Sequence, residues 1–392
     1  SSDVCSSDLM FLVCLFPSIV FSAPPNCVAP LKTPAPVPSS YKPVYSSVII
    51  RHGARSPQSA YLPISQRGHW VCDSDDAYAP RLYATIKQEY RRFKQIFDPK
   101  LIEFLPNCRA GDLLLQGMEQ HYQLGKMYNK YFRMKNGLFK DGYDLNKDIF
   151  VRATDFDRTL RSAESFINGA FHPKKPFENM SIVRGAEKFD PMRPSQSFCK
   201  DLNDVYERME NEEAYIEHSK NMWAKIKHIA DFVGQEFSYS NLNLVANWVI
   251  TLHCNEQKLP SIITEKDIEV CHEIAADFNN QPYRRNATVA VSYMMKEVMK
   301  VAKAVVEGRS KFKFSLFSAH DSTVAAFINY FKYSDLSTIP PYASHILTEV
   351  FKKGKKYYIR WSYNGNILHD LVSWDDFLLE INDCYQYCLE TP

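Results

Sequence analysis

Residues 44–50 contain no charged side chain and end in a β-branched Val-Ile-Ile run. Such an apolar strand is typical of the centre of a parallel sheet, where helices cover both faces. Two further strand signals, at residues 148–152 and 312–317, are each followed by a polar turn and a helical pattern, at 158–171 and 323–331. Because parallel strands need crossover connections of this kind, the chain is predicted to form an α/β fold.

The remaining patterns place a helical insertion within this core. Residues 173–286 combine helical periodicity and charged faces with few strand signals, which predicts a mainly helical cap domain. Residues 117–131 predict an amphipathic helix, and Asn-Gly-Asn near residue 365 predicts a hairpin. We therefore expect a three-layer α/β core with a mostly parallel, mixed sheet flanked by helices, formed by residues 44–172 and 287–392.

Residues 1–22 are interpreted as a sequencing scar followed by a signal peptide. Residues 1–9 repeat Ser-Ser-Asp, and the apolar run 10–21 is too short to span a bilayer and ends in small residues that suit signal-peptidase cleavage. Residues 23–43 are rich in proline and lack hydrophobic periodicity, which predicts an extended leader. With no anchor-like apolar stretch near the C-terminus, we expect a protein that is secreted or held in the lumen of a lysosome-like or vacuole-like compartment.

Cysteine usage supports the same compartment. Of the ten cysteines, those that follow residue 22 are even in number, as a disulfide framework requires. None forms a Cys-x-x-Cys pair, so a zinc site is disfavoured, and the spacing leaves every pairing open. The sequons at Asn179 and Asn286 are candidate N-glycosylation sites.

The nearly balanced overall charge excludes binding to nucleic acids or membranes through a large excess of positive charge. Lys and Arg number 47 against 45 Asp and Glu among 392 residues, so a strongly basic nucleic-acid binder and a polybasic membrane-surface protein are both excluded. Any positive charge that matters must therefore be local.

Such local charge gathers where three predicted strands end, in residues 51–57, 152–159 and 319–323. Arginine offers forked, permanently charged donors that match phosphate oxygens, and a helix N-terminus also favours an anion. In open α/β sheets, ligands bind outside the carboxyl ends of the strands, so we expect the three segments to converge. The candidate residues are Arg51, His52, Arg55, Arg158, His320 and Asp321.

In this order, Arg-His-Gly-Ala-Arg-Ser-Pro at 51–57, Arg-Ala-Thr-Asp-Phe-Asp-Arg-Thr at 152–159 and Ala-His-Asp-Ser-Thr at 319–323 resemble the histidine acid phosphatase family, branch two of the histidine phosphatase superfamily. Residues 117–125 also look like the lysosomal and prostatic type of that family. The resemblance extends over nearly all of the chain after the leader. It implies a phosphomonoester hydrolase that works through a phosphohistidine intermediate, without a metal or another cofactor.

The resemblance also implies a role for each candidate residue. His52 corresponds to the nucleophile and Asp321 to the proton donor, and the phosphate is bound by Arg51, Arg55, Arg158 and His320. Small phosphomonoesters are the implied substrates, phosphoproteins are a further class, and a homodimer is compatible with the family. The resemblance further suggests that Cys199 pairs with Cys384 or Cys388.

Ala54 departs from the family's pattern, in which Asp is common, and this puts the substrate preference in doubt. Three alternatives stay open: a phytase or sugar-phosphate phosphatase of narrower specificity, a phosphomutase, and a non-catalytic phosphate-binding or adhesive protein on the same fold. The signal peptide and disulfides argue against a mutase. A binder would need neither the nucleophile His52 nor the acid Asp321, so the enzyme is favoured.

Three further polar features are expected to be structural. Arg152 is predicted to have a structural partner rather than a phosphate ligand, and His121, on the helix that begins near Gly117, is predicted to be a packing or hydrogen-bonded residue. The lysine-rich stretch 352–356 is predicted to be the solvated tip of a hairpin.

Overall fold

The computed structural model describes residues 24–72, 105, 108–173, 178–186, 190, 192–194, 196, 199–333 and 339–389. The expected sequencing scar and signal peptide lie outside these residues. Within them, no helix is both long and apolar enough to cross a membrane.

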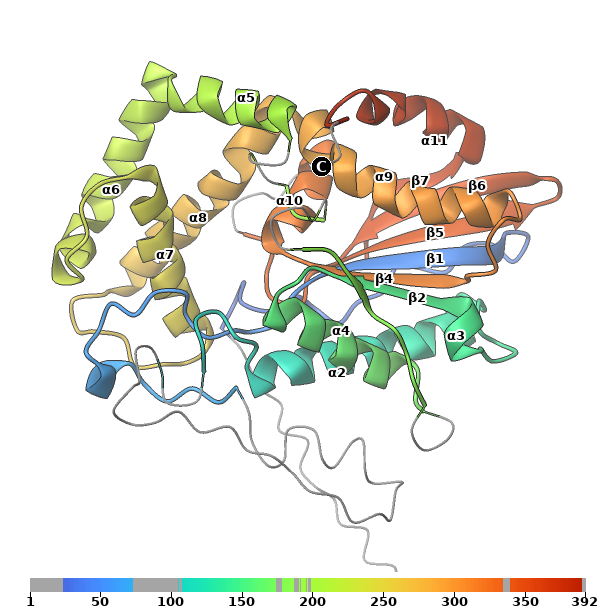
Figure 1. The fold of residues 1–392 in the computed structure, drawn as a ribbon, viewed down its shortest axis with the longest axis horizontal. Coiled ribbons are helices and arrows are strands. Elements are labelled where there is room, and N and C mark those ends of the chain that lie inside the picture. Colours follow the sequence, from blue (N-terminus) through green and yellow to red (C-terminus); the bar gives the residue numbers. More distant parts are fainter. Residues whose placement is uncertain are drawn as a thin grey trace, which may run out of the picture.

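A mixed sheet forms the middle layer (Figure 1). The 7-stranded sheet has the order β3-β2-β4-β1-β5-β6-β7. The strands from β3 to β1 run parallel, whereas β5, β6 and β7 continue from β1 as antiparallel neighbours. Their bounds are β1 Lys42–Arg51, β2 Ile149–Ala153, β3 Val183–Arg184, β4 Phe314–Ala319, β5 His345–Lys353, β6 Lys356–Tyr363 and β7 Asn366–Ser373.

Helices cover both faces of this sheet, which confirms the expected three layers. Val48 and Ile50 of β1 pack with the helices of one face, whereas Ile49 packs with the helices of the other. The alternation follows from the two-residue period of a strand, and it explains why consecutive residues of β1 are all apolar. The first face carries α2 (Leu115–Lys130) and α4 (Asp157–Ala170), and the second carries α9 (Ala287–Val306), α10 (Asp321–Tyr330) and α11 (Trp374–Glu380).

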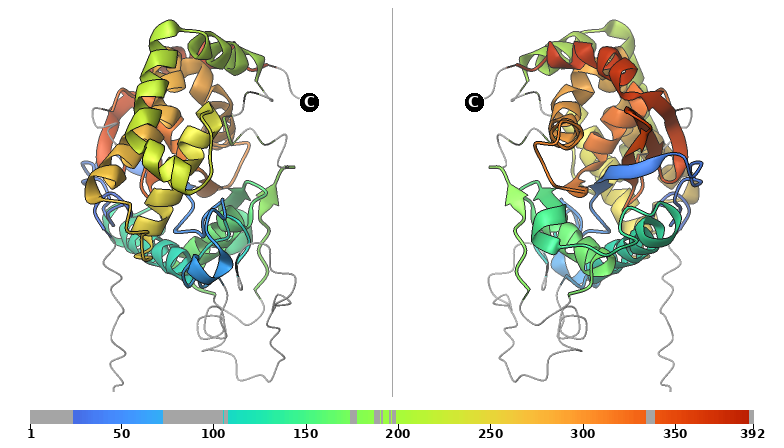
Figure 2. Two further views of the ribbon diagram at one scale, coloured as in Figure 1. Left: turned by 90° about the vertical axis from the view of Figure 1, so that its left-hand side faces the viewer. Right: turned by 90° about the vertical axis from the view of Figure 1, so that its right-hand side faces the viewer.

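Four further helices gather beyond the carboxyl ends of the parallel strands (Figures 1 and 2). The last three of them share a hydrophobic cluster with Ala54 and Leu114, whereas Leu202 of the first packs in the cluster of the second sheet face. The helices are α5 (Lys200–Glu210), α6 (Glu213–Phe232), α7 (Tyr239–Cys254) and α8 (Glu265–Arg285). The division into a core and a cap domain at residues 173 and 286 stays a prediction.

The connections of the parallel strands diverge beside β4, which predicts a ligand crevice there. The helices that follow β1 and β2 lie on one face of the sheet, whereas α10, which follows β4, lies on the other. Since β4 lies between β2 and β1, its carboxyl end is a topological switch point, where adjacent chains diverge and leave room for a ligand.

The local predictions near the C-terminus agree with the structure. Asn364 and Gly365 both adopt positive φ, at 45° and 79°, as a tight hairpin turn between β6 and β7 requires. Ser373 caps α11 by accepting a hydrogen bond from the Asp376 backbone N–H. The lysine-rich stretch 352–356 is exposed at the turn between β5 and β6, as predicted.

The proline-rich segment before β1 is extended but tied to the folded chain. Cys27 forms a disulfide with Cys254 at the end of α7, and the neighbouring backbone pairs with Tyr342. Part of the expected leader therefore belongs to the folded structure. Two more disulfides join Cys72 to Cys108 and Cys199 to Cys388.

The disulfide framework differs from the full pairing that an even number of cysteines predicted. Cys271 and Cys384 are free thiols, and both are buried. Of the two suggested partners of Cys199, the structure has Cys388. Three disulfides nevertheless fit an oxidising compartment, secreted or lumenal.

Candidate active site

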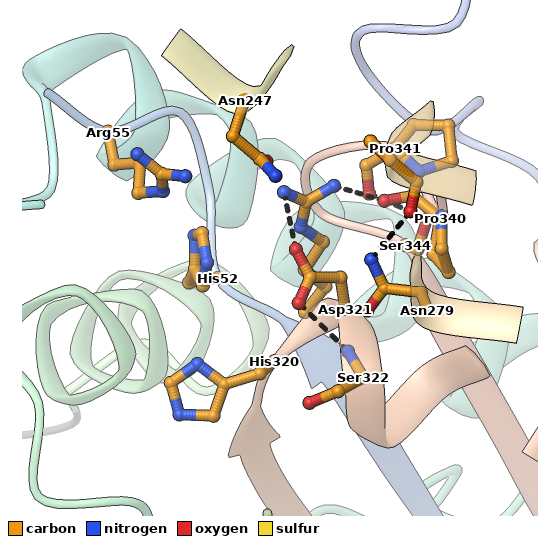
Figure 3. A network of polar contacts seen from close by, with 12 residues as sticks. His52, Arg55, Asn247, Asn279, His320, Asp321, Ser322, Pro340, Pro341 and Ser344 are labelled. Atoms are coloured by element: carbon orange, nitrogen blue, oxygen red, sulfur yellow. Dashed lines mark hydrogen bonds and ion pairs between the residues drawn. The ribbon is translucent and has the colours of Figure 1, made fainter. Parts of the chain in front are cut away.

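The three predicted motifs meet at the carboxyl ends of β1, β4 and β2. The His52 backbone N–H donates to the Ala319 carbonyl oxygen (3.0 Å), and the Thr154 N–H donates to Ser318 (3.2 Å). The three chain segments therefore leave the sheet side by side, although they are far apart in the sequence. Figure 3 shows the side chains of His52, Arg55, His320 and Asp321 gathered there.

His52 is buried, and its ring orientation is fixed by its own loop. Its Nδ1 lies 2.8 Å from the Gly53 carbonyl oxygen, which can only accept a hydrogen bond. The hydrogen of the neutral ring is therefore on Nδ1, and Nε2 carries the free lone pair. Burial, followed by the charges of Arg158 and Arg51, holds the pKa of His52 well below its usual value, so the ring stays neutral.

His320 is also buried and is oriented by two threonines. The Thr159 hydroxyl donates to the Thr154 carbonyl oxygen (2.8 Å), so its oxygen is left to accept from the Thr154 hydroxyl (2.9 Å). Thr154 Oγ1 then accepts from Nε2 of His320 (2.9 Å). Burial and the charge of Arg158 lower the pKa of His320 well below its usual value, so the neutral ring has its single hydrogen on Nε2.

Three arginines surround the two histidines. Arg51 forms an ion pair with Asp321 (3.0 Å), donates to the Pro340 carbonyl oxygen and lies over the Tyr342 ring. Arg55 donates to the Ser56 carbonyl oxygen (3.0 Å) and to Gln58 (3.3 Å), so its charge has no carboxylate partner among the described residues. This leaves positive charge available to an anion.

Arg158 opens α4 and stacks on an aromatic ring. Its guanidinium carbon lies 4.4 Å from the centroid of Phe156, and its Nε is buried without a hydrogen-bond partner among the described residues. Burial, followed by the charge of Arg55, lowers the pKa of Arg158 to about 9. An unsatisfied donor in a crowded cationic site is the arrangement that a bound anion would stabilise.

Asp321 is the carboxylate that balances part of this charge. Burial alone would raise its pKa, but the charges of Arg51 and Arg55, with the hydrogen bond from the Ser322 backbone, outweigh burial and hold the pKa of Asp321 below its usual value. Asp321 is therefore ionised in the free protein. Its other carboxylate oxygen accepts from the Ser322 backbone N–H (2.8 Å), which fixes the side chain at the start of α10.

Two glycines allow α2 to pack directly against the His52 loop. A Cβ on Gly53 would lie 2.5 Å from the Gly117 carbonyl oxygen, and a Cβ on Gly117 would lie 2.3 Å from the Ala54 oxygen. At this close contact, the Gly53 N–H donates to Ser162 (3.2 Å) and the Ala54 N–H donates to Gln120 (2.9 Å). The loop is thus held rigidly in place.

Sequence reasoning missed these supporting residues for different reasons. Thr154 and Thr159 lie inside the second motif, so their spacing was visible, but their link to His320 exists only in the folded chain. Gln120 and Tyr342 belong to none of the three motifs. Tyr342 reaches the site because its loop pairs with residues 27–29, which no local pattern indicates.

Three polar or substituted positions near the site have structural surroundings. Arg152 pairs with Asp190 (3.3 Å) and Glu297, so its guanidinium has structural partners. His121 is completely buried, and burial lowers its pKa to about 3, as for a neutral packing residue. Ala54 is buried in the cluster shared with the cap helices, where a charged side chain would be costly.

Side chains from α7 and α8 also lie close to the site. Figure 3 shows Asn247 of α7 and Asn279 of α8 beside the ion pair between Arg51 and Asp321. The Asn255 side chain, just after α7, lies 3.5 Å from the Arg55 carbonyl oxygen. Neutral amides, which both donate and accept, therefore face the place where the rest of a ligand would lie.

Known proteins with similar sequences and folds were compared with this chain. The family model of the histidine phosphatase superfamily, branch 2, matches residues 46–364. Counting factor 60 from Dictyostelium discoideum is 24% identical over 395 residues, which is 96% of this chain and 93% of the relative. Prostatic acid phosphatase from Homo sapiens is 23% identical and covers 66% of this chain and 70% of the relative.

Solved structures share the fold at low sequence identity. The apo form of Hafnia alvei phytase superimposes with a TM-score of 0.55 at 13% identity, covering 83% of this chain and 85% of the phytase.

Proposed function

Because the chain is a phosphatase that belongs to branch 2 of the histidine phosphatase superfamily, we propose that it hydrolyses phosphate monoesters through a phosphohistidine formed on Nε2 of His52. The observation that carries this proposal is the free lone pair of a neutral, buried histidine among three arginines. Such a nucleophile needs no further activation, and the arginines supply charge where the transferring phosphoryl group needs it.

In the first step, Nε2 of His52 forms a bond to phosphorus while the ester oxygen–phosphorus bond breaks. The leaving alkoxide takes a proton from Asp321. In the second step, the Asp321 carboxylate takes a proton from a water molecule, whose oxygen attacks phosphorus and displaces Nε2. Phosphate leaves, and the neutral His52 and the protonated Asp321 are restored.

The charges of the site support an acid-favoured reaction. Asp321 is ionised in the free protein, so it can act as an acid only after its pKa rises. A bound phosphate dianion offsets the charge of the arginines and favours protonation of both Asp321 and Nδ1 of His320. The protonated His320 would then donate a hydrogen bond to phosphate, a bond that the neutral tautomer cannot make from Nδ1.

The proposed setting is an acidic secreted or lysosome-like environment, and no metal takes part in the proposed steps. Small phosphomonoesters are the proposed substrates, with phosphoproteins as a further class. A phytase-like or sugar-phosphate specificity is the alternative enzyme, and a phosphate-binding protein is the alternative without turnover. Homodimerisation and glycosylation at the exposed Asn179 and at Asn286 stay predictions.

The test is hydrolysis of p-nitrophenyl phosphate between pH 4 and 7 with excess EDTA. We expect acid-favoured turnover in the parent protein, and His52→Ala should lose more than about 10³-fold in kcat because it lacks the nucleophile. His369→Ala, which removes a histidine from β7, is the matched control and should keep the parent activity.

Two outcomes would contradict the proposal. Folded His52→Ala protein with parent-like turnover would exclude the phosphohistidine, and inhibition by EDTA would exclude a metal-free reaction. If the folded parent hydrolyses neither this ester nor inositol and sugar phosphates, the binding protein becomes the better explanation.

A further inference from the structure

Arg193 is a fourth arginine beside the active site, between β3 and α5. Its side chain is exposed, and its guanidinium forms no ion pair or hydrogen bond with another described residue. The family motifs do not include it. An unpaired guanidinium next to a phosphate site is chemically suited to a second anionic group.

Phe156 fixes the position of Arg193 relative to the phosphate-binding residues. The Arg158 guanidinium carbon lies 4.4 Å from the centroid of this ring, and the Arg193 carbon lies 5.7 Å from it. His320 packs edge-on against the same ring, at 5.0 Å between centroids. Because both arginine distances share one centroid, the two guanidinium carbons are at most about 10 Å apart.

Asp190, three residues before Arg193, and Asp155, beside the Phe156 ring, already have other partners. Asp190, whose carbonyl oxygen accepts from the Arg193 N–H, uses its carboxylate for Arg152 (3.3 Å). Asp155, next to Phe156, pairs with Arg184 (3.0 Å). These carboxylates therefore do not neutralise Arg193, and its charge contributes to the lowered pKa values of Arg158 and His320.

The balance of charge leaves room for more than one phosphate group. Four guanidinium groups lie at the site, on Arg51, Arg55, Arg158 and Arg193. Among the described residues, the one carboxylate that forms an ion pair with any of these arginines is Asp321, which pairs with Arg51. The two histidines are neutral in the free protein. A phosphate dianion would therefore leave at least one positive charge unmatched, and protonation of Asp321 and His320 in the complex would add to this excess.

We propose that Arg193 forms a second anion site, which selects phosphomonoesters whose leaving group carries a carboxylate or another phosphate. The proposal rests on the phosphatase function proposed above and names a substrate class for the same site. The exposed position of Arg193 places the second anion at the mouth of the crevice, where a leaving group of variable size can extend into solvent.

The test compares two phosphonates that cannot be hydrolysed, so it does not depend on turnover. One is 4-carboxybenzylphosphonate, with a carboxylate across the ring from its phosphonate, and the other is the neutral 4-carbamoylbenzylphosphonate. Calorimetric Kd values are measured for the parent, Arg193→Gln and Arg193→Lys. Arg309→Gln is the matched control, because it removes an exposed arginine at the end of α9.

The parent should bind the carboxylate about five- to ten-fold more tightly than the amide, and Arg193→Gln should remove this preference. Arg193→Lys should keep part of it, and Arg309→Gln should keep all of it. The proposal would be overturned if Arg193→Gln kept the parent's preference for the carboxylate. It would also be overturned if Arg309→Gln lost this preference as fully as Arg193→Gln. If the protein shows no turnover but prefers the carboxylate ligand in a way that depends on Arg193, the second anion site is supported and the proposed phosphatase function is rejected.

Discussion

At the scale of single residues, the proposed reaction depends on the protonation states of His52, His320 and Asp321. The site keeps both histidines neutral and Asp321 ionised in the free protein, which is the correct state for the nucleophile and the wrong state for the acid. A substrate dianion raises the pKa of Asp321, so the carboxylate can be protonated and act as an acid. His52 can still attack phosphorus, because it uses the lone pair of Nε2. Substrate binding and acid catalysis are therefore coupled through charge.

This coupling predicts a pH dependence that belongs to Asp321. In the complex, the pKa of Asp321 should lie above its lowered value in the free protein, so kcat should be highest below that raised pKa and fall as the pH rises through it. Asp321→Asn should remove this limb and lower kcat for alkyl phosphates by about 10²- to 10⁴-fold.

The control is the choice of ester. p-Nitrophenyl phosphate has a good leaving group that needs little protonation, so Asp321→Asn should slow it much less than it slows alkyl phosphates. Equal slowing of both esters in pH–rate profiles would show that Asp321 is not the proton donor.

At the scale of elements, a buried polar network fastens the helical layer to the antiparallel half of the sheet. Glu349 of β5 forms an ion pair with Arg360 of β6 (2.6 Å), and both side chains are almost fully buried. Glu349 also accepts hydrogen bonds from Tyr131 (2.7 Å) and Asn136 (2.7 Å), which follow α2. The network therefore fixes the helix that packs against the His52 loop.

Removing one partner should be costly, because the other charge stays buried. Glu349→Ala should lower the free energy of unfolding by about 3–5 kcal/mol, measured by urea denaturation at neutral pH. Glu307→Ala, which breaks an exposed pair with Arg309, should change it by less than about 0.5 kcal/mol. A loss of similar size in both variants would mean that water screens the Glu349 pair.

At the scale of the whole molecule, disulfides connect parts that are distant in the sequence. Cys199, which caps α5, is joined to Cys388 near the C-terminus across a separation of 189 residues. Closing so long a loop restricts the unfolded chain strongly. This crosslink holds the start of the cap helices against the helices of the core.

The double variant Cys199→Ala/Cys388→Ala should lower the free energy of unfolding by about 2–5 kcal/mol, seen as a lower Tm. Both cysteines are replaced so that Cys199 cannot pair with the free thiol of Cys384. In Cys384→Ala, peptide mapping should still find all three disulfides. Loss of the Cys199 crosslink in that variant would show that Cys384 is its partner in solution.

Features that depend on neighbouring residues could be predicted from the amino-acid sequence. Apolar runs, N-caps and the Asn-Gly turn are encoded within a few positions, so the α/β class, the last hairpin and every strand except β3 and β5 could be predicted. The three motifs also indicated the candidate site residues, because they occur together at predicted strand ends and resemble one family. The family match supports the same conclusion.

How those residues act on one another depends on contacts that form when the chain folds. The hydrogen on His52, the two-threonine link to His320 and the lowered pKa of Asp321 depend on burial and on charges from distant segments. The same is true of Arg193, which stood outside every motif and reaches the site through Phe156. The spacing of residues along a chain predicts local structure. Electrostatic interactions depend on the distance between groups in space and on their burial, and both are set only when the chain folds.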